Sequence, residues 1–571
     1  MLTLRATRQV SIRVSSPLWV LSPGLLDEPT IRVRETRHVT PVDEAPVQRL
    51  TAAYTACRPH VSRSRDRGCV YVRVRWTSHV GVATVTIPAS PHGLTRKSVG
   101  SSGLSVLGVS ASAPMTVLAG GVIATFATAG VLGVPLAFIL LTIPLLLVSV
   151  GLVAMSRDME HAGAFYALIA RGLGRTCGLA GAGVALVAYN AIQISLYGLF
   201  GATVAGIVGG TWWVWAAAVW VVVTLLGLRH IELNTRVVGV VLSVELAVIV
   251  LFIAASVTHP AESGNNMASL KPSALFANGI GVVLALTVAA FIGFETVIVY
   301  REEAREWRAV RRAALGTVLF LGAFYTLASW ALTVVVGPSQ IVDAVRSPGS
   351  AGLPFSVLET HYGPIMSGLG QAVLITSVFA AMVSFHHVVA RYVYGLSREG
   401  ILPASWGVTG GSIGGVPIGG SIVQSVIAAA TILVAIALNA DPFTAVFALL
   451  SEAAAIGVLL LMIGASLSVI LFYRRTPARP ERWQWLIAPA VGGVALAVIL
   501  AITVLNITAV TGSTASYVQW LLPGVILVAA ITGAVWAQVL RQRRPGVYAA
   551  IGYGLPKPLA VLDRSLSHLE L

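Results

Sequence analysis

The sequence has few charged residues and very few cysteines. Asp, Glu, Lys and Arg make up only 11% of its 571 residues, whereas soluble domains contain about 25%. Apolar residues make up 56%, and the mean hydropathy is +0.83. Lipid is therefore the expected solvent, which excludes an ordinary cytosolic enzyme. The three cysteines (Cys57, Cys69 and Cys177) are widely spaced and form neither a disulfide framework nor a metal-binding motif.

Motifs of the common catalytic classes are also missing. The sequence contains no Gly-x-x-x-x-Gly-Lys-Ser/Thr, no His-Glu-x-x-His and no Gly-x-Ser-x-Gly. An ATP-driven pump is therefore not expected. A channel would need a repeated filter sequence, and a membrane-bound enzyme would need more clustered His or Cys than the His386–His387 pair. We expect no enzymatic activity, no cofactor and no bound metal.

Residues 1–100 differ from the rest of the chain. They hold 15 Arg or Lys against 6 Asp or Glu, and no helical period lasts two turns. The longest candidate strand alternates from Val70 to Trp76, and no apolar stretch typical of a signal peptide follows the first basic residues. The segment is interpreted as a disordered basic extension, as sequence upstream of the true start, or as a lipid- or nucleic-acid-binding arm. No function is assigned to it.

Residues 101–545 contain the membrane-spanning signal, and 546–571 form a tail. A spanning helix needs about 20 mostly apolar residues. Twelve segments meet this criterion, and no charged stretch between them is long enough for a separate domain. They lie at 104–127, 132–155, 178–208, 212–229, 236–257, 279–300, 312–336, 366–397, 421–438, 443–473, 486–507 and 518–540.

Basic residues alternate between the two sides of these segments. One side holds 21 Arg or Lys, including Arg157, Arg301 and Arg474, and the other holds only Lys271 and Arg346. Because cytoplasmic loops are enriched in basic residues, both termini are predicted to be cytoplasmic, in a multi-pass protein of the cell membrane. Topology thus explains the net charge of residues 101–571, and no nucleic-acid partner is expected.

Two segments carry helix-breaking residues at their centres. Segment 1 contains Ala111-Ser112-Ala113-Pro114-Met115-Thr116, and segment 6 contains Phe291-Ile292-Gly293-Phe294-Glu295. Proline removes a backbone donor, and paired interrupted helices in two halves indicate a transporter binding site. Because segment 6 comes five segments after segment 1, the halves would be inverted repeats. A packing kink is the alternative for each break.

Backbone groups freed at such breaks would suit a zwitterion. Amides at the start of a half-helix attract a carboxylate, and free carbonyls attract an ammonium. We therefore expect the first break (Ala111, Ser112, Ala113, Pro114 and Thr116) to bind the carboxylate of an amino acid. The second break (Phe291, Ile292, Gly293 and Phe294) is expected to bind its ammonium group.

Three motifs resemble the amino acid–polyamine–organocation superfamily of permeases. They are Phe291-x-Gly293-x-Glu295, the run from Ala162 to Tyr166, and the run from Ala390-Arg391 through Arg398-Glu399-Gly400 to Pro403. The resemblance covers about residues 101–545 and points to the amino acid permease branch. It implies an all-α membrane protein with a 5+5 inverted-repeat core of the leucine-transporter type plus two helices. Segment 1 departs from the family by having Ala-Pro-Met-Thr where many members carry glycines.

An ionisable residue inside the membrane indicates a functional role or a specific partner, because inserting its charge at the centre of a helix costs about 2.5–3.5 kcal/mol. Glu245 stands where related permeases have a lysine, so a proton or a cation could bind there. Glu295 resembles the acid of segment 6 in the family and is expected to hold the break or face the substrate amine. For Glu245 a purely structural role is equally open. For Glu452, hydrogen bonding between helices is favoured.

Polar side chains on segments 3 and 8 are further candidates for substrate contact. Tyr189, Gln193 and Tyr197 share one helical face, with Asn190 beside it. Bonding between helices is the alternative for these residues. The resemblance places Phe385 where some antiporters have a gating aromatic, and His386 is slightly favoured over His387 to face the site.

These observations predict secondary transport of an amino acid by alternating access. The proton is preferred over sodium as the coupling ion, because of Glu245 and because the resemblance to the family implies it, and Glu245 and Glu295 are the candidate coupling residues. An amine or polyamine permease and an amino acid exchanger are the alternatives. A cationic amine would need further carboxylates in the site.

Overall fold

The computed structural model describes residues 31–34, 52–56, 70–77, 82–86, 99–157, 164–229, 231–276, 279–347, 352–410, 415–477, 479–511 and 517–553. The chain divides into two compact units, residues 1–91 and 92–571.

The first unit contains a four-stranded antiparallel sheet. Its strands are β1 (Ile31–Arg34), β2 (Ala52–Ala56), β3 (Val70–Thr77) and β4 (Val82–Thr86), in the order β1-β4-β3-β2. In register, Val74 of β3 lies opposite Val85 of β4 and Ala52 of β2. The candidate strand from Val70 to Trp76 is confirmed as β3.

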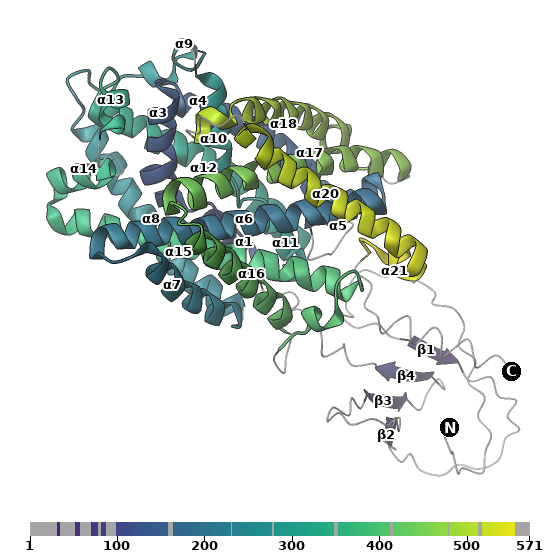
Figure 1. The fold of residues 1–571 in the computed structure, drawn as a ribbon. Helices are drawn as coiled ribbons and strands as arrows, with labels where there is room; N and C mark the ends of the chain where they lie inside the picture. The colour runs from purple at the N-terminus through teal and green to yellow at the C-terminus, as the bar shows by residue number, and fades with distance from the viewer. Residues whose placement is uncertain are drawn as a thin grey trace, which may run out of the picture. The chain divides into compact units, whose positions relative to one another are not determined.

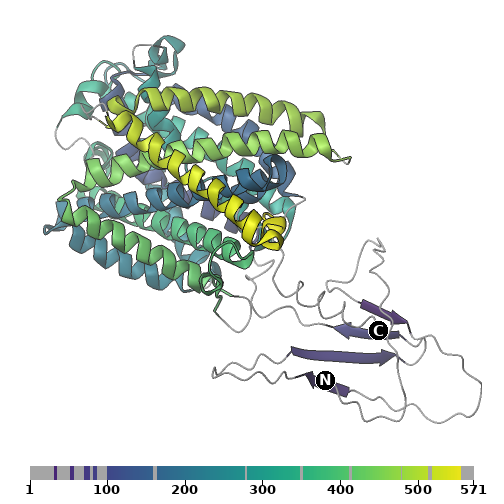
Figure 2. The ribbon, with the colours of Figure 1, turned by 45° about the vertical axis from the view of Figure 1, so that its right-hand side comes forward.

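The described residues of the second unit form helices and the segments that connect them (Figures 1 and 2). Its first half contains α1 (Ser101–Ala111), α2 (Pro114–Thr116), the π-helix η1 (Val117–Val122), α3 (Ile123–Ala129), α4 (Val134–Ser156), α5 (Ala164–Leu173), α6 (Arg175–Val208), α7 (Trp212–Gly227), α8 (Ile231–Thr258), η2 (Ala268–Leu270) and α9 (Pro272–Leu275). The middle contains α10 (Ile280–Ala289), α11 (Thr296–Val299), η3 (Tyr300–Glu302), α12 (Trp307–Val336), α13 (Ile341–Arg346), α14 (Leu353–Tyr362) and α15 (Pro364–Arg398). The last part contains η5 (Ala404–Gly407), α16 (Ile418–Ala437), η6 (Pro442–Ala448), α17 (Leu449–Arg475), η7 (Trp483–Ile487), α18 (Ala488–Leu505), α19 (Ile507–Thr511), α20 (Tyr517–Arg543) and α21 (Pro545–Ala550).

Ten helices in the described residues are long and apolar enough to cross a membrane. They correspond to ten of the twelve predicted segments. The segments predicted at 212–229 and 279–300 contain shorter apolar helices, α7 and α10. The multi-span, all-α class of this unit is therefore confirmed, whereas the count of twelve stays a prediction.

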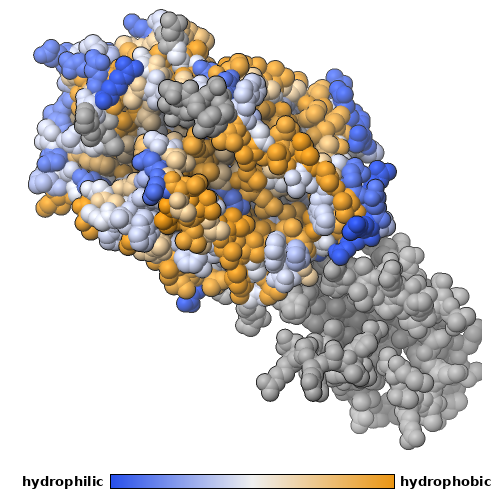
Figure 3. Space-filling view, viewed as in Figure 1, coloured by the Kyte–Doolittle hydropathy of each residue, from blue (hydrophilic) through white to orange (hydrophobic). Residues whose placement is uncertain are grey.

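The surface of the helical unit matches a lipid environment. Figure 3 shows hydrophobic residues over most of the middle of one face and hydrophilic residues toward its two ends. Large apolar side chains are exposed along α20, including Trp520, Leu527 and Val528. By contrast, the span from Ser101 to Ala129 is the most deeply buried. The bundle is thus built around the first broken helix, and α20 lies on its outside.

Candidate functional site

The first spanning helix is broken at Ser112 and Ala113. Helix α1 ends at Ala111, and α2 starts at Pro114, whose ring cannot continue the hydrogen-bond ladder of α1. Ala113 has φ +46°, in the left-handed region that residues with a side chain rarely adopt. The hydroxyl of Tyr325 on α12 donates a hydrogen bond to the Ser112 carbonyl at 3.1 Å. A side chain from another helix thus satisfies a backbone group freed by the break.

The second break lies against the first. Between α10 and α11 the chain runs irregularly through Gly293, which has φ +120°. A Cβ atom at Gly293 would lie 2.7 Å from the backbone carbon of Ala111 and 2.9 Å from the Ser112 nitrogen. Only glycine permits this close approach of the two backbones. Sequence reasoning predicted both breaks, and the structure places them in contact.

A cavity of about 350 Å³ extends from these breaks toward one end of the bundle. Its deep residues are buried, whereas the rim residues Thr128, Thr444 and Ala509 are exposed. The volume lies within the range of about 300–1,000 Å³ typical of small-molecule sites. Six of the predicted substrate-binding residues line it: Ala111, Ser112, Ala113, Thr116, Ile292 and Phe385.

Glu245 holds the first break from outside the cavity lining. Its Oε1 accepts hydrogen bonds from the Met115 amide at 2.6 Å and from the Ser377 hydroxyl at 2.6 Å. Neither Met115 nor Glu245 lines the cavity. The amide of Met115 is a free donor because it belongs to the first turn of α2. A carboxylate from α8 therefore occupies the helix start where sequence reasoning expected a substrate carboxylate.

A chain of hydroxyl groups connects the cavity to Glu245. Thr116, which lines the cavity, lies 3.3 Å from the Ser377 hydroxyl. Since Ser377 donates to Glu245, Thr116 is the donor to Ser377. Ser377 was not among the site residues predicted from the sequence.

Glu295 stabilises the second break. Its Oε2 accepts from the Gly293 amide at 2.9 Å, and its Oε1 accepts from the Tyr189 hydroxyl on α6 at 3.1 Å. The ring of Tyr189 packs on Phe385 and Tyr392 of α15. These contacts agree with the first of the two roles considered for Glu295, holding the break, and Glu295 does not line the cavity.

Gln193 and His386 lie together in a buried polar network away from the cavity lining. Gln193 Nε2 is 3.3 Å from His386 Nδ1, and His386 Nε2 is 2.6 Å from the Ser421 hydroxyl. Gln193 also bonds Tyr197 and Gln424. The shared face of Gln193 and Tyr197 is confirmed. This network joins α6, α15 and α16, as expected for hydrogen bonding between helices.

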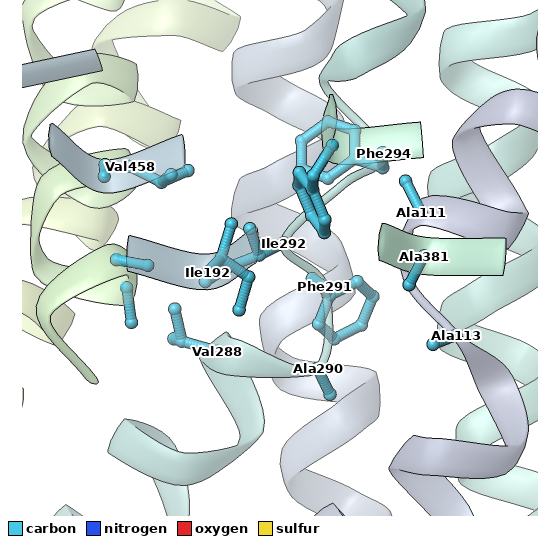
Figure 4. Close-up of a cluster of buried hydrophobic side chains, with 14 of the residues drawn as sticks. Ala111, Ala113, Ile192, Val288, Ala290, Phe291, Ile292, Phe294, Ala381 and Val458 are labelled. Atoms are coloured by element: carbon cyan, nitrogen blue, oxygen red, sulfur yellow. The ribbon is translucent and has the colours of Figure 1, made fainter. Parts of the chain in front are cut away.

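The remaining candidates lie beside the cavity rather than in its lining. Asn190 donates to the Leu186 carbonyl of its own helix, and Pro114 begins α2. Phe291 packs against both Phe138 and Tyr325, with its ring centroid 6.0 Å and 5.9 Å from theirs. Figure 4 shows the side chains of Phe291 and Phe294 between Ile192 on one side and Ala111 and Ala113 on the other. These aromatic residues therefore pack the two breaks together.

Glu452 differs most from its expected role. It is only 2% exposed, it lines the cavity, and its Oε1 has no hydrogen-bond partner among the described residues. The prediction of hydrogen bonding between helices is therefore wrong for this residue. The neighbouring Ser451 does bond to another helix, through the hydroxyl of Ser195 on α6. Nothing in the sequence indicated that the Glu452 carboxyl instead faces the cavity.

The opposite end of the bundle is closed by ion pairs. Arg391 Nε lies 2.5 Å from Glu303 Oε1, and both side chains are at most 3% exposed. Arg398 pairs with Glu302 at 2.5 Å. Beside them, Val99 pairs with the backbone of residues 303–305. The arginines belong to the motif that closes segment 8, so the structure gives a physical role to that pattern.

A larger hollow of about 870 Å³ lies on the outside of the bundle, between α6 and α20. Its lining is almost wholly apolar and includes Leu186, Trp520 and Trp536. It offers few polar groups that could orient a polar substrate. Within the part of the chain that the structure describes, no three His, Cys, Asp or Glu side chains come together to bind a metal ion.

Comparisons with known proteins identify the family. The family model for amino acid permeases matches residues 102–531. No curated protein sequence matches the chain. Among solved structures, it is similar to a manganese transporter of Eremococcus coleocola in complex with an aromatic bis-isothiourea substituted compound, at 13% identity and TM-score 0.49, over 79% of this chain and 98% of that one. A mutant of the same transporter also matches at 13% identity and TM-score 0.49, over 78% and 94% of the two chains. Because the family model matches most of the chain, the protein belongs to the amino acid permease family and is a multi-pass membrane transporter rather than an enzyme.

Proposed function

We propose that the protein transports an amino acid across the cytoplasmic membrane by secondary active transport. The observation that carries this proposal is the contact of two broken helices at Gly293, beside a cavity of about 350 Å³ that their neighbouring residues line. Broken helices at mid-membrane are typical of transporter binding sites because they present backbone groups to a substrate. Ala111, Ser112, Ala113 and Ile292 bring these backbone segments to the cavity.

The arrangement of the two ends supports alternating access. The cavity reaches the end of the bundle formed by Thr128 and Thr444, whereas the other end is closed by the pairs of Arg391 and Arg398. With both termini cytoplasmic, the closed end faces the cytoplasm and the cavity faces outward. Breaking the two ion pairs would open the site inward.

The proposal is tested by measuring counterflow uptake in proteoliposomes that contain the purified full-length protein. A pool of labelled amino acids is offered with and without an inward proton gradient. Uptake of at least one amino acid supports the proposal. Uptake of amines alone would favour an amine permease, and exchange that ignores the gradient would identify an exchanger.

Proton coupling is proposed to act through Glu245. Its carboxyl is linked to the cavity through Ser377 and Thr116, and it also holds the amide of Met115. Gaining a proton would remove the negative charge that favours the start of α2. Gain or loss of a proton at Glu245 would therefore alter the first break, which forms part of the cavity wall.

Replacing Glu245 with glutamine is expected to abolish stimulation by the proton gradient while leaving exchange intact. The amide oxygen of Gln can still accept from Met115, but the side chain cannot take up a proton. The measurement is uptake with and without the gradient, with Glu359→Gln as the control because Glu359 is exposed on α14. Stimulation that persists in the Glu245 variant would exclude this residue as the coupling site.

A further inference from the structure

Glu452 is a buried carboxyl group that the described protein leaves unpaired. It lies on α17 in the wall of the cavity, and its Oε1 has no hydrogen-bond partner. The other buried acids in the described part of the bundle accept hydrogen bonds or form ion pairs. Glu295 accepts two hydrogen bonds, and Glu303 pairs with Arg391. Glu452 therefore differs from them because it lines the cavity and because its Oε1 accepts no hydrogen bond from the described residues.

Among the residues that the structure describes, no other side chain in the cavity lining can neutralise this group. The polar side chains that share the lining with Glu452 are the neutral hydroxyls of Ser112, Thr116, Thr128, Thr444 and Ser451. The hydroxyl of Ser451 is already bonded to Ser195. A buried carboxylate without a partner is costly, and a paired and hydrogen-bonded cation offsets that cost. A cation supplied by a ligand would fill this gap.

The surroundings of Glu452 suit a substrate with two polar ends. The helix breaks belong to α1, α2, α10 and α11, whereas Glu452 reaches the same cavity from α17. Ile192, Leu196 and Leu286 provide apolar surface in the same lining. Methylene groups of a long cationic side chain pack well on such surface while the charged end reaches a polar partner.

We propose that Glu452 binds the cationic side chain of the transported amino acid, so that the substrate is a basic amino acid. This inference rests on the proposed function and specifies its substrate class. An amino acid whose carboxylate and ammonium groups bind beside the breaks, at the cavity-lining residues Ser112, Thr116 and Ile292, would extend its side chain along the apolar lining to Glu452. Glu452 is then a specificity-determining residue.

Lysine and norleucine test the proposal, because norleucine has the same chain length without the side-chain ammonium group. Their uptake is measured in proteoliposomes with the full-length protein, Glu452→Gln and the control Glu359→Gln. The unmodified protein is expected to prefer lysine. Because a hydrogen bond to a charged group contributes about 1.5–3 kcal/mol, Glu452→Gln is expected to weaken lysine transport about 10- to 100-fold. Norleucine transport should be unchanged or improved.

The outcomes separate this inference from the proposed function. Transport of norleucine but not lysine by the unmodified protein would overturn the inference and leave amino acid transport standing. An equal loss of both substrates in a folded Glu452→Gln protein would also overturn it. Uptake of 1,5-diaminopentane without any amino acid would overturn the proposed function itself. If Glu452→Gln does not fold, lysine and norleucine are compared as inhibitors of the uptake of a labelled amino acid by the unmodified protein. Lysine should inhibit more strongly, and stronger inhibition by norleucine would overturn the inference.

Discussion

Replacing Gly293 with alanine is expected to abolish transport and to lower the thermal stability of the protein. Gly293 has φ +120°, and an added Cβ would lie 2.7–2.9 Å from the backbone of Ala111 and Ser112. Strained backbone of this kind costs about 1–3 kcal/mol, and overpacking a close contact costs about another 1–3 kcal/mol. The added Cβ can be accommodated only if the two breaks move apart. Because residues of both breaks form part of the cavity wall, this movement would deform the cavity. Uptake into proteoliposomes and thermal unfolding in detergent measure the two effects.

Gly316→Ala is the matched control for this prediction. Gly316 lies inside α12, and a Cβ atom there would meet no other atom within 4 Å. Since alanine is favoured over glycine inside a helix by about 0.5–1 kcal/mol, Gly316→Ala should keep full transport and equal or better stability. Transport by Gly293→Ala at the level of Gly316→Ala would show that the contact between the breaks is not required.

Hydropathy was enough to predict most of the fold. The lengths of the apolar segments identified ten spans that the structure contains. A membrane-spanning helix must form all its backbone hydrogen bonds within itself, so its length can be recognised from one continuous segment of sequence. The two shorter helices, α7 and α10, were harder to define. Helix α10 is short because the chain leaves the helical path before Gly293, which depends on tertiary contact with Ala111.

The site was predictable where it depends on backbone chemistry and unpredictable where it depends on side-chain partners. Pro114 and Gly293 marked the breaks in the sequence. The direction of a buried carboxyl, in contrast, depends on neighbouring helices, so the sequence did not reveal which of Glu245 and Glu452 faces the cavity. Glu245 meets Ser377 and Met115, whereas Glu452 faces the cavity.

One signal for the missed partners was present in α15. Its residues Ser377, Ser384, Arg391 and Arg398 recur at every seventh position, and such residues share one helical face with a drift of only about 20° per repeat. In the structure they contact Glu245, Ser110, Glu303 and Glu302, respectively. This polar face follows the two broken helices from the cavity to the closed end.

Breaking the buried pair at the closed end is expected to destabilise the protein strongly. Arg391→Met leaves Glu303 as a buried carboxylate without its cation, and the loss of one partner of such a pair costs about 3–5 kcal/mol. Both side chains are at most 3% exposed, and Arg391 Nε and Nη2 each donate to the Glu303 carboxylate. Thermal unfolding in detergent should show a large fall for Arg391→Met and little change for Arg308→Met, since Arg308 is exposed.

The double variant Arg391→Met/Glu303→Leu separates the pair's role in stability from its role in closing this end. Removing both charges eliminates the unpaired carboxylate, so unfolding temperature should recover toward that of the unmodified protein, as happens when apolar residues replace a buried ion pair. The recovery beyond the sum of the single effects measures the coupling of the two residues. Because the closed end would then lack its charge pair, the transport rate of the double variant should still differ from that of the unmodified protein, even though the unfolding temperature has recovered. A double variant as unstable as the sum of the two single variants would show that Arg391 and Glu303 act independently.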